Sequence, residues 1–339
     1  MAAPKAPHSG PSARRVVITG AFGFVGRWLA TELFARDPGI EIIGWGLRGE
    51  GADQIPGVRR MGVDIVDRAA VFAAMAEVMP AAVINLAAIA APREAALDPD
   101  RAWRVNLFGA MNVAEAVLAK APAARFVQIS SSEVYGGSFA RKAGPLDEKA
   151  ALEPLNVYAL TKAASDLAVG KLAHDGLKAV RFRPFNHTGP GQGEAFVVAA
   201  LASQIARIEQ GLKAPVLHIG NTNVSRDLLD VRDIVKAYAS AVTDDDLPAG
   251  EVLNLASGVA HGIGDIADRL CAMAKIKIAI EVDPARVRAN DLARTLGDAS
   301  RAKALLGWQP VIPIERTLRD VLDFWREKAA AERKETGTR

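Results

Sequence analysis

Residues 15–26 read RVVITGAFGFVG and place a glycine-rich turn directly after a β-branched run. The run ends at Gly20, and Gly23 and Gly26 follow at intervals of three. Small residues let such a turn stay tight, and the helix that follows presents free N–H groups to a pyrophosphate. A glycine triplet alone also fits a plain tight turn. Its position between a strand and a helix predicts a dinucleotide-binding site.

Short apolar runs alternate with helical patterns over the first 180 residues or so. Continuous apolar runs are typical of parallel strands that are buried on both faces. Their alternation with helices predicts an α/β protein with a Rossmann-type doubly wound parallel sheet. The expected strands are 16–19, 40–45, 62–65, 82–86, 125–130 and 179–182, and the expected helices are 24–35, 67–78, 99–120 and 156–175.

The pattern changes after a loop at 184–193, which is rich in proline and glycine. The later segments predict a smaller C-terminal mixed α/β lobe that binds substrate. Its expected helices are 195–211, 232–242, 262–274, 298–306 and 314–328, and its expected strands are 215–219, 226–230, 251–256 and 278–283. The predicted division is a flexible tail at 1–13, a cofactor-binding domain at 14–185 to which segments near 220–256 return, the substrate lobe mainly at 186–328, and a frayed tail at 329–339.

The composition excludes several classes of protein. The 339 residues contain 42 Lys and Arg and 39 Asp and Glu, a net charge of +3, with no basic run for a nucleic acid. Cys271 is the one cysteine, so no internal disulfide or cysteine metal cluster is possible, and a reducing, cytoplasmic location is expected. No apolar stretch is long enough to span a membrane, and residues 1–13 lack the apolar segment of a secretory signal.

Two residues bear on the choice of cofactor. No acidic residue ends the second predicted strand, where NAD-binding proteins carry one; Glu41 lies at its start. Arg48 lies where a cation could meet the 2′-phosphate of NADP, so NADP(H) is favoured over NAD(H), although a surface loop residue also fits. Asp64 follows the next strand and is interpreted either as a partner of the adenine amino group or as a helix cap beside Asp67.

Tyr158 and Lys162 lie four residues apart on a predicted helix and therefore on one face of it. A nearby ammonium is expected to lower the pKa of a tyrosine, which could then exchange a proton with a carbonyl or an alcohol while hydride moves to or from a nicotinamide. Residues 130–133 read SSSE at the carboxyl end of a central strand, the edge at which open α/β sheets bind ligands. Tyr and Lys at this spacing also fit an ordinary helix surface.

Several motifs together resemble the extended short-chain dehydrogenase/reductases, the superfamily of NAD(P)-dependent sugar-nucleotide epimerases and dehydratases. The resemblance covers roughly residues 14–328. It is carried by TGAFGFVG (19–26), NLAA (85–88), VNLFG (105–109), SSSEVYG (130–136), YALTK (158–162), RPFNHTGPGQ (183–192), SRDLLDVRD (225–233), NLASG (254–258) and LGWQP (306–310).

The resemblance implies a role for each matching residue. The implied catalytic residues are Ser131, Tyr158 and Lys162, with Asn106 supporting the helix and its proton path and Glu133 near the reacting sugar. The implied cofactor-binding residues are Gly20, Phe22, Gly23, Phe24, Val25, Gly26, Arg48, Asp64, Ile65, Leu86, Ala87, Ala88, Tyr158, Lys162 and Phe185. The implied substrate-binding residues are Ser131, Ser132, Asn186, Val197, Arg226, Arg288 and Asp291. No metal is implied. His187 either touches the substrate or bonds only to backbone.

Within the superfamily, residues 183–192 and 283–286 most resemble the GDP-4-keto-6-deoxy-D-mannose reductases. The implied enzyme uses NADPH to reduce GDP-4-keto-6-deoxy-D-mannose to GDP-D-rhamnose. The alternative is a 4,6-dehydratase or 4-epimerase with a recycled bound cofactor, in which Glu133 is the base. A non-catalytic NADP-binding regulator is the third interpretation, which intact Ser131, Tyr158 and Lys162 argue against. A homodimer through helices 99–120 and 156–175 is implied, although these helices could also be buried within one chain.

Overall fold

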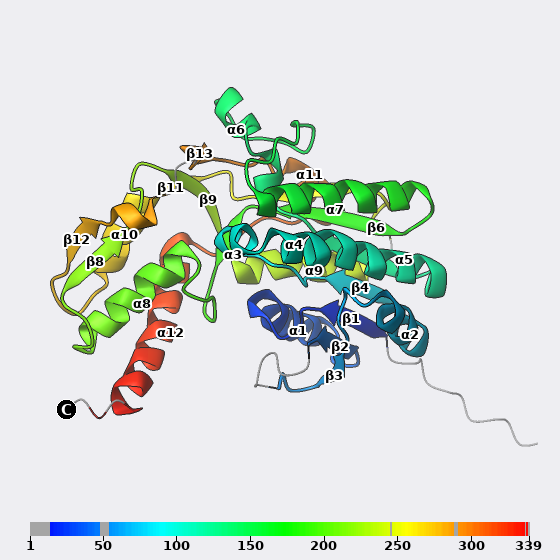
Figure 1. Ribbon diagram of the computed structural model, residues 1–339, viewed down its shortest axis with the longest axis horizontal. Coiled ribbons are helices and arrows are strands. Elements are labelled where there is room, and N and C mark those ends of the chain that lie inside the picture. Colours follow the sequence, from blue (N-terminus) through cyan, green and yellow to red (C-terminus); the bar gives the residue numbers. More distant parts are fainter. Residues whose placement is uncertain (1–13, 48–53, 245, 288–290, 336, 338–339) are drawn as a thin grey trace, which may run out of the picture.

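A seven-stranded parallel sheet forms the centre of the computed structural model, which describes residues 14–47, 54–244, 246–287, 291–335 and 337 (Figure 1). Its strand order is β10-β6-β5-β4-β1-β2-β3, and neighbouring strands pair in parallel. The strands are β1 (Arg15–Thr19), β2 (Glu41–Gly46), β3 (Val58–Gly62), β4 (Ala82–Asn85), β5 (Arg125–Ile129), β6 (Ala179–Pro184) and β10 (Val252–Leu255). This order is that of a doubly wound sheet, so the predicted fold class is confirmed.

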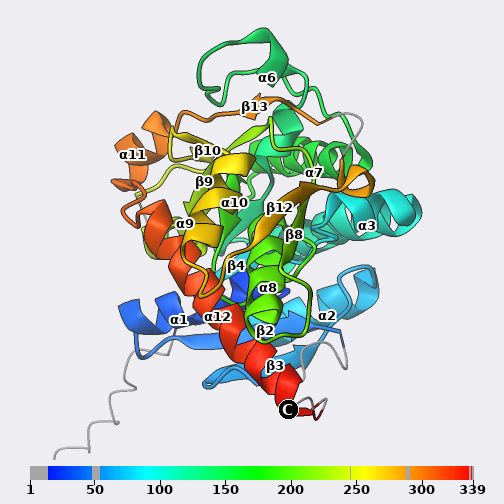
Figure 2. The same ribbon diagram turned by 90° about the vertical axis from the view of Figure 1, so that its left-hand side faces the viewer.

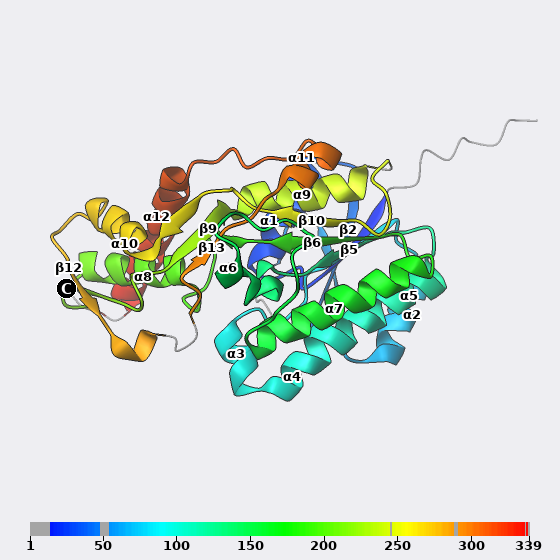
Figure 3. The same ribbon diagram turned by 90° about the horizontal axis from the view of Figure 1, so that it is seen from above.

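Helices cover both faces of this sheet, as Figure 3 shows from above. One layer contains α1 (Phe24–Arg36), α9 (Val231–Thr243) and α11 (Ser300–Leu306), and the other contains α2 (Arg68–Val78), α3 (Pro92–Leu97), α4 (Pro99–Trp103), the π-helical turn η1 (Arg104–Gly109), α5 (Ala110–Lys120) and α7 (Val157–His174). In β1, Val16 and Ile18 pack toward the first layer and Val17 toward the second. Because both faces are covered, each strand needs a continuous apolar run.

A smaller lobe lies beyond the carboxyl ends of the strands and faces the viewer in Figure 2. It contains β7 (Asn186–Thr188), α8 (Val197–Glu209), β8 (Val216–Ile219), β9 (Ser225–Asp230), β11 (Ala260–Gly262), α10 (Ile263–Ala272), β12 (Ala279–Val282), η3 (Pro284–Arg286), β13 (Arg294–Thr295) and α12 (Ile314–Glu335). Its core includes Ile205 of α8, Leu270 of α10 and Leu318 of α12. The 3₁₀ turn η2 (Ser132–Tyr135) and α6 (Ser138–Arg141) follow β5, and α6 lies at the top of Figure 1.

The chain crosses between the two parts more than once. After β9, α9 packs on α1 and β10 pairs with β6, so this stretch joins the main sheet. Asp233 of α9 then anchors the segment that leads to α12: its carboxylate accepts hydrogen bonds from the backbone of Val311 and Ile312, both at 2.9 Å. Trp308 Nε1 donates to the Asp233 carbonyl at 2.7 Å. The lobe is therefore fixed to the sheet by buried polar contacts.

Three predicted elements differ from the structure. The strand expected at 62–65 is β3 (Val58–Gly62), an edge strand whose Arg59 and Arg60 are exposed and hide the apolar signal. The helix expected at 99–120 is divided into α4, η1 and α5. The loop expected at 184–193 contains β7, which pairs with β9.

The C-terminal tail also differs from the prediction. Fraying was expected from Ala329, but α12 continues to Glu335. Ala329 is buried in the core of the lobe, and Glu332 pairs with Arg207 of α8 at 2.9 Å. Packing against α8 thus stabilises a highly charged helix end. The flexible tail predicted at 1–13 lies outside the described residues. No described helix combines the length and apolar character that a membrane span requires.

Replacement of Gly26 with Ala should destabilise the packing of α1 on β1. A Cβ at Gly26 would lie 2.3 Å from the carbonyl oxygen of Ala21, so the backbone must shift. We expect the free energy of unfolding in urea to fall by about 1–3 kcal/mol, the usual cost of overpacking. Gly144→Ala is the matched control, because its Cβ would meet no atom within 4 Å. Equal stability of the two variants would contradict this packing argument.

Candidate active site

The turn between β1 and α1 brings backbone N–H groups to the carboxyl edge of the sheet. Gly20 has a φ of +66°, and a Cβ there would lie 2.9 Å from the amide nitrogen of Ala87. Gly23 is the N-cap of α1, no side chain caps it, and the first turn has no acidic residue. The first N–H groups of α1, those of Phe24, Val25 and Gly26, are therefore suited to an anion. This geometry fits the pyrophosphate of a dinucleotide.

A buried chain of polar side chains crosses the three central strands below this edge. Thr19 Oγ1 donates to Asn85 Oδ1 at 2.6 Å, and Asn85 Nδ2 donates to Gln128 Oε1 at 2.9 Å. Ala87 N donates to Thr19 Oγ1 at 3.1 Å, so the chain also fixes the loop that follows β4. Thr19 and Gln128 were missed from sequence, because a polar residue that ends an apolar run looks like an ordinary strand end. The contacts define the position of the loop Leu86–Ala88.

The predicted catalytic residues lie together at the carboxyl end of β5 and the amino end of α7. Ser131 follows β5, and its Oγ accepts a hydrogen bond from the Glu133 backbone at 3.1 Å. Tyr158 and Lys162 lie on the first turns of α7. Asn156 caps α7 through its side chain, and its Nδ2 donates to Glu133 Oε2 at 3.0 Å. Asn156 therefore connects the helix to the loop, a role that the sequence analysis missed although an Asn before a helical pattern signals a cap.

The pKa of Tyr158 departs from the expectation. Burial raises the pKa of Tyr158, the charge of Glu133 raises it further, and a hydrogen bond with Ser131 lowers it. The prediction that Lys162 lowers this pKa is wrong for the structure, because the Lys162 ammonium donates to the carbonyl of Ile129. Burial lowers the pKa of Lys162 to about 8, against the charge of Asp166, which raises it. Tyr158 is accordingly a protonated phenol at neutral pH.

A buried ion pair lies one helical turn beyond Lys162. Asp166 accepts hydrogen bonds from Arg183 Nε at 2.9 Å and Nη2 at 3.0 Å, and from Arg181 Nη1 at 2.9 Å. Burial by itself raises the pKa of Asp166, but these arginines hold that pKa below its usual range. Arg183 also donates to the Tyr135 hydroxyl at 3.1 Å, which donates to Asn254 Oδ1 at 2.7 Å. The network connects α7, β6, β10 and η2.

Asn106 lies in the π-helical turn η1 and is almost fully buried. Its Oδ1 accepts from Ile89 N at 2.8 Å, and its Nδ2 donates to Ile89 O at 3.2 Å and to Thr161 Oγ1 at 2.9 Å. Thr161 lies between Tyr158 and Lys162 on α7. Asn106 thus joins the loop after β4 to α7, and it does so from a π-helical turn, a feature that is frequent at functional sites.

The residues expected to bind substrate come from several elements around the edge. Ser132 is buried in η2, Asn186 is exposed at the start of β7, and Val197 is exposed at the start of α8. Arg226 forms an ion pair with Asp291, and its Nη1 donates to the Leu292 carbonyl at 2.7 Å. Arg226 and Asp291 are therefore positioned by each other.

Some expected site residues are not brought into the site or cannot be placed. Arg48 and Arg288 lie outside the described residues. Asp64 is exposed, and its Oδ1 accepts from Val66 N at 2.9 Å; the cap of α2 is Asp67. The helix-cap interpretation of Asp64 is therefore wrong, and the adenine interpretation stays a prediction.

The remaining candidates differ in how far they are exposed. Phe22, Ile65 and Phe185 are buried, whereas Leu86, Ala87 and Ala88 are half-buried. His187 Nδ1 lies 3.0 Å from the Phe185 carbonyl, and its ring stacks on Phe24 with the centroids 6.5 Å apart. Burial lowers the pKa of His187, which favours the neutral ring. His187 makes the backbone bond that the sequence analysis weighed and also joins the loop to α1.

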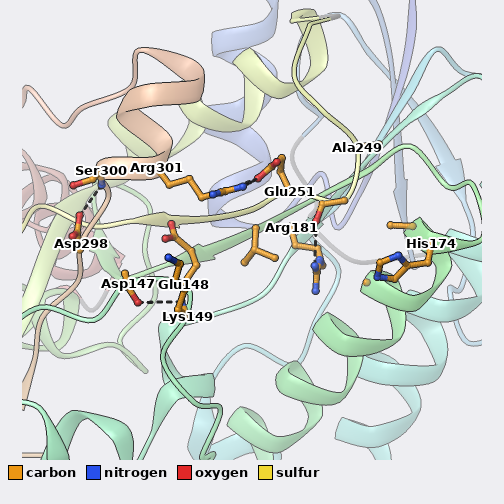
Figure 4. A pocket seen from close by; sticks show the side chains of 14 residues that line it. Asp147, Glu148, Lys149, His174, Arg181, Ala249, Glu251, Asp298, Ser300 and Arg301 are labelled. Atoms are coloured by element: carbon orange, nitrogen blue, oxygen red, sulfur yellow. Dashed lines mark hydrogen bonds and ion pairs between the residues drawn. The ribbon is translucent and has the colours of Figure 1, made fainter.

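A cavity of about 600 Å³ lies away from these residues (Figure 4). It is lined by the far end of α7, including His174, and by the amino-terminal parts of β6 and β10. Two arginines of its lining form ion pairs: Arg301 with Glu251, and Arg181 with Asp166. Parallel sheets bind ligands at the carboxyl ends of their strands, so this cavity is not the active site. No metal-binding group of His, Cys, Asp or Glu exists among the described residues.

Comparisons with known proteins agree with this geometry. Residues 17–321 match the family described as GDP-mannose 4,6 dehydratase. The chain is 36% identical over 320 residues to GDP-6-deoxy-D-mannose reductase from Pseudomonas aeruginosa, and the match covers 94% of this chain and 99% of that protein.

Two solved structures are similar over nearly the whole chain. RMD from Pseudomonas aeruginosa, complexed with NADPH, matches with a TM-score of 0.77 and 32% identity, covering 93% of this chain and 100% of that one. The UDP-glucose 4-epimerase of Thermus thermophilus, in complex with NAD, matches with a TM-score of 0.80 and 28% identity, covering 92% and 99%. The chain belongs to the GDP-mannose 4,6 dehydratase family, within the NAD(P)-dependent extended short-chain dehydrogenases/reductases.

Proposed function

We propose that this enzyme uses NADPH to reduce the 4-keto group of a GDP-4-keto-6-deoxyhexose, converting GDP-4-keto-6-deoxy-D-mannose to GDP-D-rhamnose. The observation that carries the proposal is the state of Tyr158. Its phenol stays protonated, lies in hydrogen-bonding contact with Ser131 and stands at the sheet edge beside the glycine turn. A reductase needs a proton donor at this place. The similarity to the Pseudomonas aeruginosa reductase supports the same reaction.

The proposed reaction needs one proton donor and one group that orients the ketone. NADPH, when bound, supplies the hydride to carbon 4 of the sugar. The Ser131 hydroxyl holds the ketone oxygen, and Tyr158 Oη donates its proton to that oxygen as the carbon–oxygen double bond becomes single. The resulting phenolate takes a new proton from solvent. Asn106 positions the helix that carries both residues.

We further propose the following division of the chain. Residues 14–185, with segments near 220–256, hold the cofactor: the glycine turn takes the pyrophosphate and the Lys162 ammonium takes hydroxyls of the nicotinamide ribose. Residues 186–328 hold most of the sugar nucleotide. Arg226, fixed by Asp291, and Arg288 bind its diphosphate, because guanidinium groups match phosphate oxygens. Asn186, Val197 and Ser132 face the sugar. Among the cofactors, NADP(H) is favoured, which the NADPH complex of the Pseudomonas protein supports.

A 4,6-dehydratase that recycles its cofactor is the second candidate. The position of Glu133 favours it: this carboxylate is held by Asn156 and acts electrostatically on Tyr158. Glu133 could remove the proton from carbon 5 of a 4-keto intermediate. In that case the bound cofactor is restored after each turnover. Net consumption of NADPH with the keto sugar therefore supports the reductase, and conversion of GDP-mannose without net consumption supports the dehydratase.

Replacement of Tyr158 with Phe should remove the proton donor and keep the fold. We expect kcat for the keto sugar to fall by about 10²–10⁴-fold, the usual contribution of general acid catalysis. The dissociation constant for NADPH, measured by fluorescence titration, should stay within about twofold, since a ring of the same size remains.

The matched control is Tyr238→Phe. Tyr238 is also buried, but its hydroxyl has no hydrogen-bond partner in the described part of the chain, so its loss should leave kcat unchanged. Near-normal turnover by Tyr158→Phe would remove Tyr158 from the mechanism.

The pKa of Lys162 predicts how activity depends on pH. Its ammonium, which we assign to the cofactor, loses its proton as the pH rises through about 8. We therefore expect kcat/KM for NADPH, which reports the free enzyme, to be constant below this pH and to fall above it. In Lys162→Arg the guanidinium stays charged, so the residual activity should lose this decline. A decline near pH 8 that persists in Lys162→Arg would assign it to another group.

The outer surface of α7 predicts a homodimer. Leu160 and Leu167 are exposed on α7, and Phe108 is exposed on the neighbouring η1. An exposed apolar face on adjacent helices is typical of a subunit interface. We propose that it packs on the same face of a second copy in the cytoplasm.

Leu167→Glu should convert the dimer to a monomer, because it buries a charge in this interface. Light scattering after size-exclusion chromatography measures the mass. Val311→Glu is the control, since Val311 is equally exposed but precedes α12. A dimer that survives Leu167→Glu would place the interface elsewhere.

A further inference from the structure

Phe22 fills the space above the end of β2. A Cβ at Gly44 would lie 2.9 Å from Phe22 Cζ, and one at Gly46 would lie 3.1 Å from Phe22 Cδ2. Two glycines of β2 therefore make room for the aromatic ring. Phe22 also belongs to the turn that we assign to the pyrophosphate, so its ring connects this turn to the end of β2. In doubly wound folds the adenosine ribose lies at the end of this strand.

Two arginines contact Phe22 from different elements. The Arg60 guanidinium carbon of β3 lies 3.7 Å from the centre of the Phe22 ring. Arg27 of α1 holds the same residue through its backbone, with Nε donating to the Phe22 carbonyl at 3.3 Å. Arg60 pairs in register with Gly44, so its side chain extends over the strand that lacks side chains there. Arg60 and Arg27 therefore both bring a guanidinium group to Phe22.

Stacking on Phe22 fixes the plane of the Arg60 guanidinium. An arginine that stacks on an aromatic ring keeps its N–H groups at the edges of the plane, where they can donate to phosphate oxygens. Arg60 is exposed, so a ligand can reach it. The sequence analysis assigned the 2′-phosphate to Arg48, which lies outside the described residues. Arg60 was missed because it lies within a strand rather than at its end.

We propose that Arg60, held by Phe22, binds the 2′-phosphate and gives this enzyme its preference for NADP(H) over NAD(H). The proposal rests on the cofactor preference stated under the proposed function. It assigns that preference to a guanidinium on β3, reached across Gly44 and Gly46. The aromatic ring of Phe22 orients the Arg60 guanidinium by stacking and does not itself bind the phosphate.

Binding of nucleotides to the free protein tests the proposal without turnover. Isothermal titration compares NADPH with NADH, and adenosine 2′,5′-bisphosphate with AMP. The test variant is Arg60→Met, which keeps an apolar cover on Phe22 and removes the charge. Loss of a charged hydrogen bond should raise the dissociation constants of NADPH and the bisphosphate by about 10- to 100-fold. The dissociation constants of NADH and AMP should stay within about twofold of the parent values.

Arg59→Met is the matched control. Arg59 lies next to Arg60 on the same strand and is also exposed, but it lies on the opposite face of β3, with its Nε 3.5 Å from Glu41 Oε1. The Arg59→Met variant removes the same charge from that face. Its dissociation constants for NADPH, NADH and the two adenosine nucleotides should equal those of the parent protein. If Arg59→Met weakens NADPH as much as Arg60→Met does, general surface charge explains the preference and the proposal is overturned.

The remaining outcomes separate this proposal from the one on which it rests. If the parent protein prefers NADPH and Arg60→Met keeps that preference, Arg60 is not the determinant, while the proposed NADPH-dependent function stands. If Arg60→Met weakens the binding of NADH as much as that of NADPH, Arg60 contributes to binding of the part that both cofactors share, and the proposal is wrong. If the parent protein binds NADPH and NADH equally, the cofactor preference itself fails, and this assignment fails with it.

Discussion

The buried carboxylate of Asp166 accepts hydrogen bonds from two arginines of β6, and this ion pair fixes α7, which carries Tyr158 and Lys162, on the sheet. Asp166 lies one turn after Lys162 on α7, so whatever holds Asp166 also sets the height of Lys162 and Tyr158 above the sheet edge. A buried carboxylate without its partner would cost several kcal/mol, about 3–5 kcal/mol when one partner is removed. The helix therefore cannot slide or rotate without breaking this pair.

From the same ion pair, contacts extend to the elements around the site. Arg183 reaches Tyr135, which bonds to Asn254 of β10, and Asn254 Nδ2 donates to the Leu146 carbonyl at 3.0 Å. On the other side of α7, Asn106 joins Thr161 to the loop after β4. The helix that carries Tyr158 and Lys162 is thus held by the Asp166 network and by Asn106, and Asn156 connects its amino end to Glu133. Such support is what a proton transfer over one hydrogen bond requires.

The sequence allowed the sheet to be predicted because its strands follow a local rule, whereas the catalytic set was implied by the family resemblance and stays a prediction. Apolar runs predicted the central strands, and a spacing of four placed Tyr158 and Lys162 on one face of a helix. The position of edge strand β3 was predicted wrongly, because its exposed Arg59 and Arg60 interrupt the apolar run that marks a buried strand. The end of α12 was predicted to fray because its charged residues gave no sign of the contact with α8, which joins distant segments of the chain.

Other features of the site could not follow from local pattern. The direction of the Tyr158 pKa depends on burial and on Glu133, which is brought close only by the fold. Gln128 and Arg60 act through residues far away in the chain, so no motif marks them, and the cap signal of Asn156 does not reveal its contact with Glu133. Their roles depend on which side chains meet at the sheet edge.

Transfer of deuterium tests the central claim most directly. The enzyme is supplied with GDP-4-keto-6-deoxy-D-mannose and NADPH that carries deuterium at the transferable position of the nicotinamide. The account predicts one deuterium at carbon 4 of a GDP-D-rhamnose product for each NADPH consumed, with no exchange at carbon 5. Deuterium that stays in the cofactor, together with solvent hydrogen entering carbon 5, would contradict it and would identify a recycling dehydratase.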